Sequence, residues 1–325
     1  MQHIRVITTG GTIDSGPAAG GGLSVEATAS PTLTGLLDGL MAGRASHDLA
    51  SPLNLNSEDF SLHDIEAIAA AVEAGARQGH RLFLITHGSD TLHFTAAALG
   101  LAFAGRGLTI CLAAAFRPLF ETGSDGPTTL KASIDMLLAG TAAPSTYVAL
   151  KADGGPAPAA IADWREVKPL DFDSTGMERL KDRPPPLPAM DLGFEGLGRA
   201  GRHVRFIQAH VGLNGPVLAG LTAGADIVVI GAYHSGTLPS AMADERGVTA
   251  YMNAHPETLF LLSRHPAAGE GYASARRFEA AGGILIHHLL PHQTYMLACL
   301  LRARESALAT IRGRVCRLSG RRQPT

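Results

Sequence analysis

The sequence predicts an α/β protein with a larger N-terminal domain, in which a parallel-type sheet is flanked by helices, and a smaller C-terminal α/β domain. Three observations support this prediction. The chain has 325 residues, which is more than one domain usually holds. Apolar residues make up 46% of the chain, enough for a large core. Short apolar runs alternate with segments of helical periodicity, as is typical of parallel sheets covered on both faces.

The N-terminal elements follow from apolar runs and helix end signals. We expect strands over residues 3–7, 82–86, 108–114 and 147–150, and helices over residues 61–78, 91–104 and 127–138. Ser61 and Asp64 have the spacing of a capping box, which predicts the start of the first helix. Gly79 and Gly140 are placed to end the first and the last of these helices.

A change in composition near residue 181 sets the domain boundaries. The stretch 181–202 is rich in proline and glycine and has little periodicity, so it predicts an extended linker. We therefore expect an N-terminal domain over 1–180, a linker over 181–202 and a C-terminal domain over 203–325. The last domain should hold strands over 204–208, 226–230, 258–263 and 283–286, and a helix over 294–304.

Charge and cysteine content exclude several classes of protein. The formal net charge is only -2, which argues against nucleic acid as a partner. Three cysteines at wide spacing, Cys111, Cys299 and Cys316, do not make a disulfide framework or a zinc motif. We find no signal peptide and no apolar run of the ~18 residues that a membrane span needs. We expect a cytoplasmic protein with no membrane partner.

A glycine-rich turn follows the first predicted strand. Gly10 and Gly11 carry no side chains, so backbone amides there can face a ligand. Thr12 comes next and can project a hydroxyl into the crevice beyond the strand ends, where ligands of parallel sheets bind. The alternative is a tight exit turn in which the threonine only caps.

A second such turn follows the strand over 82–86. Gly88 frees the backbone, and Ser89 and Asp90 add a hydroxyl and a carboxylate at the start of the next helix. Helix capping is the alternative reading. Two turns of this kind at the ends of two strands would share one crevice. A hydroxyl needs help to attack. The G-x-S-x-G elbow of a Ser-His-Asp triad is not present, and a threonine assisted by a serine–lysine–aspartate relay is the alternative.

These turns resemble the signatures of the bacterial-type L-asparaginase family, which includes related glutaminases and amidases. The stretch 9–13 is similar to the first signature, and 87–91 to the second, with Ser89 in the place of the usual threonine. Arg117-Pro118 with Ser124-Asp125-Gly126-Pro127 and Leu130 is similar to a third block. Weaker similarity continues through 231–239 and 282–301, so the resemblance covers nearly the whole chain.

The resemblance implies hydrolysis of L-asparagine to L-aspartate and ammonia through an acyl-enzyme, without a cofactor. Thr12 would attack the side-chain amide, with Ser89, Asp90 and a lysine as the relay. L-glutamine would be a secondary substrate. Backbone amides near Gly11 and Ser89 could hold the oxyanion. The family also implies a homodimer or homotetramer.

Substrate binding is implied in the same way. Gly11 and Gly88 would line the substrate, and Ser57 would bind its α-carboxylate. Glu58 and Asp90 would hold the α-ammonium group, since two acids suit one cation. The alternative for residues 56–59 is a plain polar loop that leads into a helix.

The sequence departs from the family at three places. No tyrosine occurs in the lid over 16–24, and Tyr233 is a stand-in helper for Thr12. The relay lysine follows Arg165-Glu166-Val167 one residue early, as Lys168, with Lys151 in reserve. Thr237 stands where the family places an asparagine that reaches a neighbouring subunit.

Two further functions stay open, and a metal is not expected. The missing lid tyrosine is compatible with an amidase for a different small amide. A non-catalytic amino-acid sensor would keep the pocket and lose the relay. His287, His288 and His292 cluster in sequence, but Pro291 interrupts them and no H-E-x-x-H is present, so we expect no metal site.

Overall fold

The computed structural model describes residues 1–17, 23–24, 29–152, 159–182, 184–185, 187, 190–240, 246–263 and 272–319. They form two compact units, Met1–Arg183 and Pro184–Thr325, each described here by itself. Among the described residues, no helix has both the length and the apolar character needed to cross a membrane.

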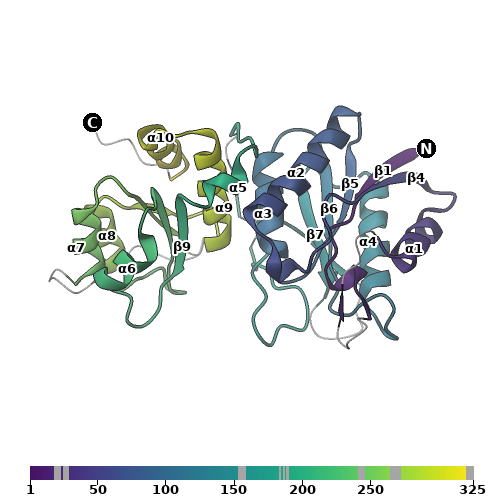
Figure 1. Cartoon of the computed structure of the whole chain (residues 1–325), viewed down its shortest axis with the longest axis horizontal. Coiled ribbons are helices and arrows are strands. Elements are labelled where there is room, and N and C mark those ends of the chain that lie inside the picture. Colours follow the sequence, from purple (N-terminus) through teal and green to yellow (C-terminus); the bar gives the residue numbers. More distant parts are fainter. Residues whose placement is uncertain are drawn as a thin grey trace. The chain divides into compact units, whose positions relative to one another are not determined.

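The first unit is built on a six-stranded sheet in the order β4-β1-β5-β6-β7-β8 (Figure 1). The strands are β1(Gln2–Ile7), β4(Ala45–Ala50), β5(Leu82–Thr86), β6(Thr109–Ala113), β7(Thr146–Lys151) and β8(Ala159–Asp163). Neighbours pair in parallel except at the β7–β8 edge, which is antiparallel. The carboxyl ends of β1, β5 and β6 therefore meet at one edge of the sheet.

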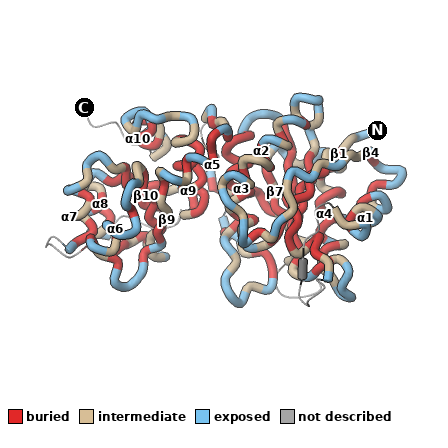
Figure 2. Tube along the Cα trace, in the orientation of Figure 1, coloured by how far each residue is buried: buried red, intermediate tan, exposed pale blue. Residues whose placement is uncertain are grey.

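Helices cover both faces of this sheet. Alternate strand residues such as Ile4, Val6 and Leu84 pack in one buried cluster with α1(Pro31–Met41) and α4(Gly126–Ala139). The opposite face lies under α2(Leu62–Arg77) and α3(Leu92–Ala102), and Figure 2 shows the strands buried between the two layers. This double cover explains why the strands read as continuous apolar runs.

Local sequence sets the helix ends. Ser61 and Asp64 form the predicted capping box at the start of α2, with the Ser61 amide donating to the Asp64 carboxylate at 2.8 Å. Gly79 just past α2 and Gly140 at the end of α4 both adopt positive φ, which a residue with a side chain rarely does.

The second unit holds a parallel sheet in the order β12-β11-β10-β9. Its strands are β9(Val204–Gln208), β10(Ile227–Gly231), β11(Leu259–Ser263) and β12(Ile284–Ile286). Its helices are α5(Leu197–Ala200), α6(Gly215–Thr222), α7(Val248–Ala254), α8(Ala273–Ala280), α9(Pro291–Arg304) and α10(Leu308–Leu318). One buried cluster joins β9–β12 to α6, α7 and α8, and α9 lies against β9, β10 and β11.

The predicted α/β class and sheet arrangement are confirmed, and the predicted strands and helices agree with the structure within a few residues. The helices α1, α5 and α10 and the strands β4 and β8 were not predicted from the sequence. Within the predicted linker over 181–202, Leu192, Phe194 and Leu197 are buried and residues 197–200 form α5, while the domain bounds stay a prediction. Gly193, Gly196 and Gly198 weaken the helical pattern of residues 192–200, but the apolar side chains of these residues are still buried. The unit boundary falls inside the predicted linker.

Candidate active site

Two turns leave neighbouring strands at the carboxyl edge of the first sheet. β1 and β5 pair in parallel, with Ile7 opposite Ile85. After β1 the chain passes through Gly10 and Gly11 into a short 3-10 turn, η1(Thr12–Asp14). After β5 it passes through residues 87–91 into α3. The two turns that the sequence singled out therefore emerge side by side.

Gly11 and Gly88 bring these two turns into direct contact. A Cβ atom added to Gly11 would lie 2.4 Å from the Gly88 amide nitrogen, a distance that no real side chain allows. Gly11 also has φ of 75°, in the region that favours glycine. Only a residue without a side chain fits here, so both the backbone conformation and the contact require this glycine.

A third segment, which includes η2(Ser57–Asp59), closes against the same point. The Gly11 amide donates to the Leu55 carbonyl at 3.0 Å, so this third segment is tied to the first turn. A Cβ atom on Gly88 would lie 2.3 Å from Ser57 Oγ. The Thr91 hydroxyl donates to the Ser57 carbonyl at 2.8 Å. Three loops thus meet around Gly11, Gly88 and the buried Ser57.

The polar residues around this junction differ in their exposure to solvent. Thr12 and Ser89 are half-buried, whereas Glu58 and Asp90 are exposed. No hydrogen bond joins the Thr12 or Ser89 hydroxyl to another residue of the described chain, so both oxygens are available to a ligand. Small cationic ligands would be attracted by the two exposed carboxylates.

The third predicted block lies at the same edge of the sheet, after β6. The Asp125 carboxylate accepts hydrogen bonds from the amides of Phe116, at 3.0 Å, and Arg117, also at 3.0 Å. The Ser124 hydroxyl donates to the Arg117 carbonyl at 2.9 Å. These bonds fold the loop after β6 back onto the start of α4.

Comparison with known proteins agrees with the signatures. The family model described as Asparaginase, N-terminal, matches residues 3–160. A probable L-asparaginase of Deinococcus radiodurans is 27% identical over 324 residues, covering 93% of each chain. These matches are consistent with the asparaginase family, and the resemblance inferred from the sequence is confirmed. They support an amidohydrolase enzyme.

Solved structures of asparaginases share the fold. The thermostable L-asparaginase from Thermococcus kodakarensis superposes with a TM-score of 0.72 at 20% identity, covering 100% of both chains. A probable cytoplasmic L-asparaginase from Campylobacter jejuni gives a TM-score of 0.70 at 17% identity, over 97% of this chain and 99% of that one. At such identities the likeness concerns the fold.

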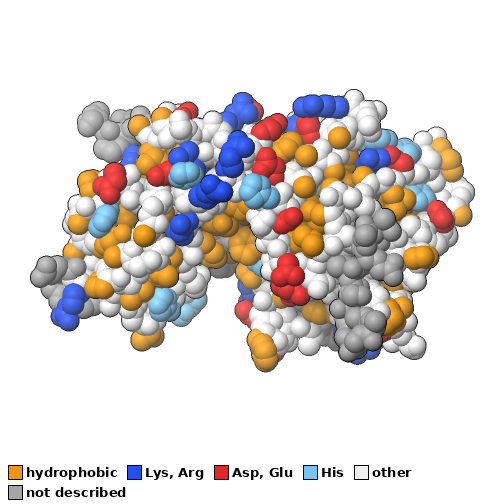
Figure 3. Space-filling model, viewed as in Figure 1, with side chains coloured by type: hydrophobic (Ala, Val, Ile, Leu, Met, Phe, Trp, Pro, Cys, Tyr) orange, Lys and Arg blue, Asp and Glu red, His pale blue; other side chains and the backbone are white. Residues whose placement is uncertain are grey.

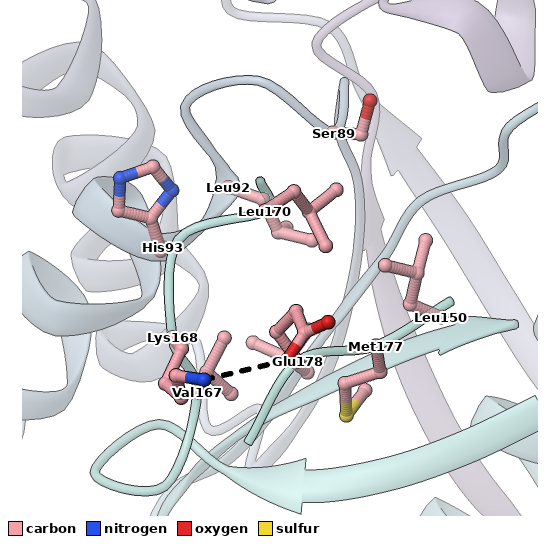
Figure 4. A pocket seen from close by; sticks show the side chains of 10 residues that line it. Ser89, Leu92, His93, Leu150, Val167, Lys168, Leu170, Met177 and Glu178 are labelled. Carbon is pink, nitrogen blue, oxygen red and sulfur yellow. Dashed lines mark hydrogen bonds and ion pairs between the residues drawn. The ribbon is translucent and has the colours of Figure 1, made fainter. Parts of the chain in front are cut away.

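A pocket in the first unit is lined by both Ser89 and the predicted relay lysine, Lys168 (Figure 4). Its walls are mainly apolar, and Ser89 and Lys168 lie toward opposite ends with Leu170 between them. Lys168 Nζ lies 3.4 Å from Glu178 Oε2. The pocket is lined by Ser89, Leu92, His93, Val148, Leu150, Val167, Lys168, Leu170, Met177 and Glu178.

The reserve lysine has a different position. Lys151 ends β7 and is half-buried, two strands away from β5 in the sheet. Strands are spaced ~4.8 Å apart, so two of them amount to about 10 Å. No ion pair joins Lys151 to another described residue. The choice between the two lysines stays a prediction.

The other departures from the family are in the lid region and in the second unit. Of the lid region, Gly16–Pro17 and Leu23–Ser24 pair as the short strands β2 and β3, and residues 18–22 are outside the described part. Tyr233 and Thr237 belong to the second unit, in one turn where the Tyr233 amide donates to the Thr237 carbonyl at 2.9 Å. Their proposed roles stay predictions.

His87 holds the second turn, although sequence analysis gave it no role. Its Nδ1 lies 2.7 Å from the Gly88 carbonyl, which can only accept, so Nδ1 carries the proton. Nε2 then accepts from the Thr95 hydroxyl at 2.8 Å. Full burial lowers the pKa of the imidazole from 6.5 to about 4, so the ring is neutral. Its position inside the second signature was the available signal.

The neutral, buried His87 predicts a loss of stability in acid. Between pH 6.5 and about 4 the unfolded chain binds a proton at this ring while the folded chain does not. The free energy of unfolding should therefore fall as the pH falls through this window, by roughly 3 kcal/mol for one such group. Urea unfolding of His87→Gln should show a pH slope smaller by about one proton. The exposed His63→Gln serves as the control, and an unchanged slope in His87→Gln would contradict the assignment.

Proposed function

We propose that this chain hydrolyses the side-chain amide of L-asparagine to L-aspartate and ammonia, through an acyl ester on Thr12. The observation that supports it best is the contact between Gly11 and Gly88, because it sets the Thr12 turn beside Ser89 and Asp90. The relatives that are named L-asparaginases point to the same substrate.

The first step forms the ester. The Thr12 hydroxyl oxygen attacks the carboxamide carbon, and its proton passes through the relay of Ser89, Asp90 and a lysine to the amide nitrogen, which leaves as ammonia. In the second step water attacks the ester carbon, aspartate departs, and the proton of the water restores the Thr12 hydroxyl. The atoms of both steps balance, and neither step needs a cofactor.

The oxyanion of each step needs donors. The Gly11 amide is already bound to Leu55, so it does not serve. The Ser89 amide has no backbone partner within the described chain and is placed at the junction. One such donor can contribute ~3–4 kcal/mol to the transition state.

The amino-acid part of the substrate would bind on the third segment. Ser57 would donate to the α-carboxylate, and the exposed Glu58 and Asp90 would hold the α-ammonium group. The backbones of Gly11 and Gly88 would line the bottom of the substrate site. L-glutamine is longer by one methylene and should be a slower substrate, because its transition state should be bound ~1–3 kcal/mol less tightly.

We also propose an oligomer and a cytoplasmic location. A homodimer or homotetramer follows from the family resemblance, and light scattering of the purified chain tests it. The Campylobacter jejuni relative is named a probable cytoplasmic L-asparaginase, and we propose the same location for this chain.

A panel of amides separates this proposal from its two alternatives. Ammonia release should be fastest with L-asparagine, slower with L-glutamine and absent with amides that lack the α-amino acid group. Faster release from an amide of another type would favour the broader amidase. Thermal stabilisation by L-aspartate without release from any amide would favour the sensor.

The relay lysine is tested by two substitutions. We expect Lys168→Met to lower kcat by about 100-fold or more, because the relay proton then has no cationic partner. Lys131→Met, on the exposed side of α4, is the matched control and should change kcat little. If Lys151→Met lowers kcat and Lys168→Met does not, Lys151 is the relay lysine. Full activity in both Lys168→Met and Lys151→Met would contradict a lysine relay.

A further inference from the structure

The amino ends of β1 and β4 carry a second group of polar side chains, away from the Thr12 junction. His3 and Arg5 alternate along β1 and so share one face of the sheet. Ser46 and Asp48 occupy the partner positions on β4, with His3 opposite Ser46 and Arg5 opposite Asp48. About 13 Å of strand separates His3 from Ile7, so the group is well apart from the turns beyond β1.

His80 joins this group from the end of α2. Gly79 turns the chain with φ of 98°, and the His80 amide then donates to the Gly75 carbonyl at 3.0 Å. α2 lies on the face that carries Arg5, since a Cβ atom on Gly75 would lie 3.4 Å from Arg5 Cγ. The His80 ring consequently stacks on His3, with centroids 4.7 Å apart.

The hydrogen bonds around His3 resemble those around a metal-binding histidine. Its Nδ1 lies 2.8 Å from Ser46 Oγ, and its Nε2 lies 2.9 Å from Asp48 Oδ1. Arg5 bonds to the other oxygen of Asp48. Partners of this kind orient ligands in metal sites, where a histidine binds through one ring nitrogen and is held by the other.

We propose that His3, Asp48 and His80 bind a divalent transition-metal ion of the zinc type. One ligand atom from each of the three residues lies within 4.8 Å of the others. Two imidazoles and a carboxylate are a ligand set that zinc accepts, with open positions for water. The side chains of His3 and Asp48 are 34% and 40% exposed, so an ion can reach them from solvent.

Only a small rearrangement is needed. The 2.9 Å between His3 Nε2 and Asp48 Oδ1 is close to the ~3.3 Å between two ligands of a tetrahedral zinc ion with bonds of ~2.0 Å. The ion would replace the proton between these atoms. The His80 ring must turn out of its stack on His3, because a metal ion lies in the plane of each imidazole that binds it. Ser46 and Arg5 keep their bonds.

Figure 3 shows histidine, basic and acidic side chains gathered near the amino end of the first unit, over β1 and β4. A bound ion there would join β1, β4 and the connection from α2 to β5. Such a link stabilises the folded state, because the ligands come together only when the chain is folded. The site is therefore structural and independent of the proposed hydrolysis.

The experiment measures binding of ZnCl2 to the full chain, prepared without a histidine tag, by titration calorimetry and thermal unfolding. We expect one ion per chain and a rise of Tm. Asp48→Asn and His80→Asn should each weaken binding by at least tenfold and remove the rise. His63→Asn, an exposed histidine on α2, is the matched control and should bind as the unaltered chain does.

Folding of the variants is checked independently by their circular dichroism and by their ammonia release, which should be unchanged. Cobalt(II) bound to the unaltered chain should also give the visible absorption of a tetrahedral site, and His80→Asn should not. The proposal is overturned if zinc does not saturate a site, or if His80→Asn and His63→Asn bind zinc equally well. A hydrogen-bonded histidine–aspartate pair without metal affinity gives the first of these results.

Discussion

Thr12→Ala should lower kcat for L-asparagine by about 10⁴-fold or more while binding of L-aspartate stays within a few-fold. The reason is that the variant lacks the oxygen that would form the ester. The pocket should survive, because Thr12 is half-buried and its hydroxyl forms no hydrogen bond with the rest of the described chain. Ammonia release measures the rate, and calorimetry measures aspartate binding.

Thr12→Ser is the matched control for this prediction. It keeps the nucleophilic oxygen and removes only a methyl group, so it should retain measurable turnover at a rate well above that of Thr12→Ala. Normal turnover in Thr12→Ala would show that another group is the nucleophile. A loss of aspartate binding equal to the loss of rate would show that Thr12 only shapes the pocket.

Gly11→Ala should destabilise the folded chain by about 2–5 kcal/mol and abolish activity. Two effects add. A side chain at φ of 75° costs ~1–2 kcal/mol. Its Cβ would also lie 2.4 Å from the Gly88 nitrogen, and relieving such an overlap costs ~1–3 kcal/mol. The two turns would move apart, so Thr12 would lose its place beside Ser89. Urea unfolding and ammonia release give the two readouts.

Gly43→Ala isolates the second effect. Gly43 has a similar φ of 70°, but a Cβ atom there meets nothing within 4 Å. It should therefore lose only ~1–2 kcal/mol, and its activity should be unchanged. Equal losses of stability in Gly11→Ala and Gly43→Ala, with activity kept in both, would contradict a tight contact between the two turns.

Sequence alone predicted the parts of the fold with strong local signals. The apolar run at 82–86 and the capping box at Ser61 and Asp64 both have direct physical causes in neighbouring residues. β4 was missed because its sequence, ASHDLA, mixes polar and apolar residues on an edge strand. α1 was missed because glycines and threonines weaken its helical pattern, and its burial comes from contact with α4.

The residues of the candidate site also differ in whether the sequence alone could predict them. Gly11, Thr12, Gly88 and Ser89 could be singled out because glycines beside hydroxyl residues at strand ends form a short, local pattern. The role of His87 could not, since it depends on Thr95 and on burial. The group of His3, Asp48 and His80 was also missed, because its members are far apart in sequence and are joined only by the pairing of β1 with β4 and by the turn at Gly79.

Trapping of the covalent intermediate tests the central claim most directly. The chain is mixed with L-asparagine, quenched in acid within milliseconds, digested and analysed by mass spectrometry. The peptide that contains Thr12 should gain the mass of one aspartyl group, bound as an ester to the Thr12 oxygen, and Thr12→Ala should show no such gain. An ester on Ser89 or another residue, or continued turnover with no ester on any peptide, would contradict the account.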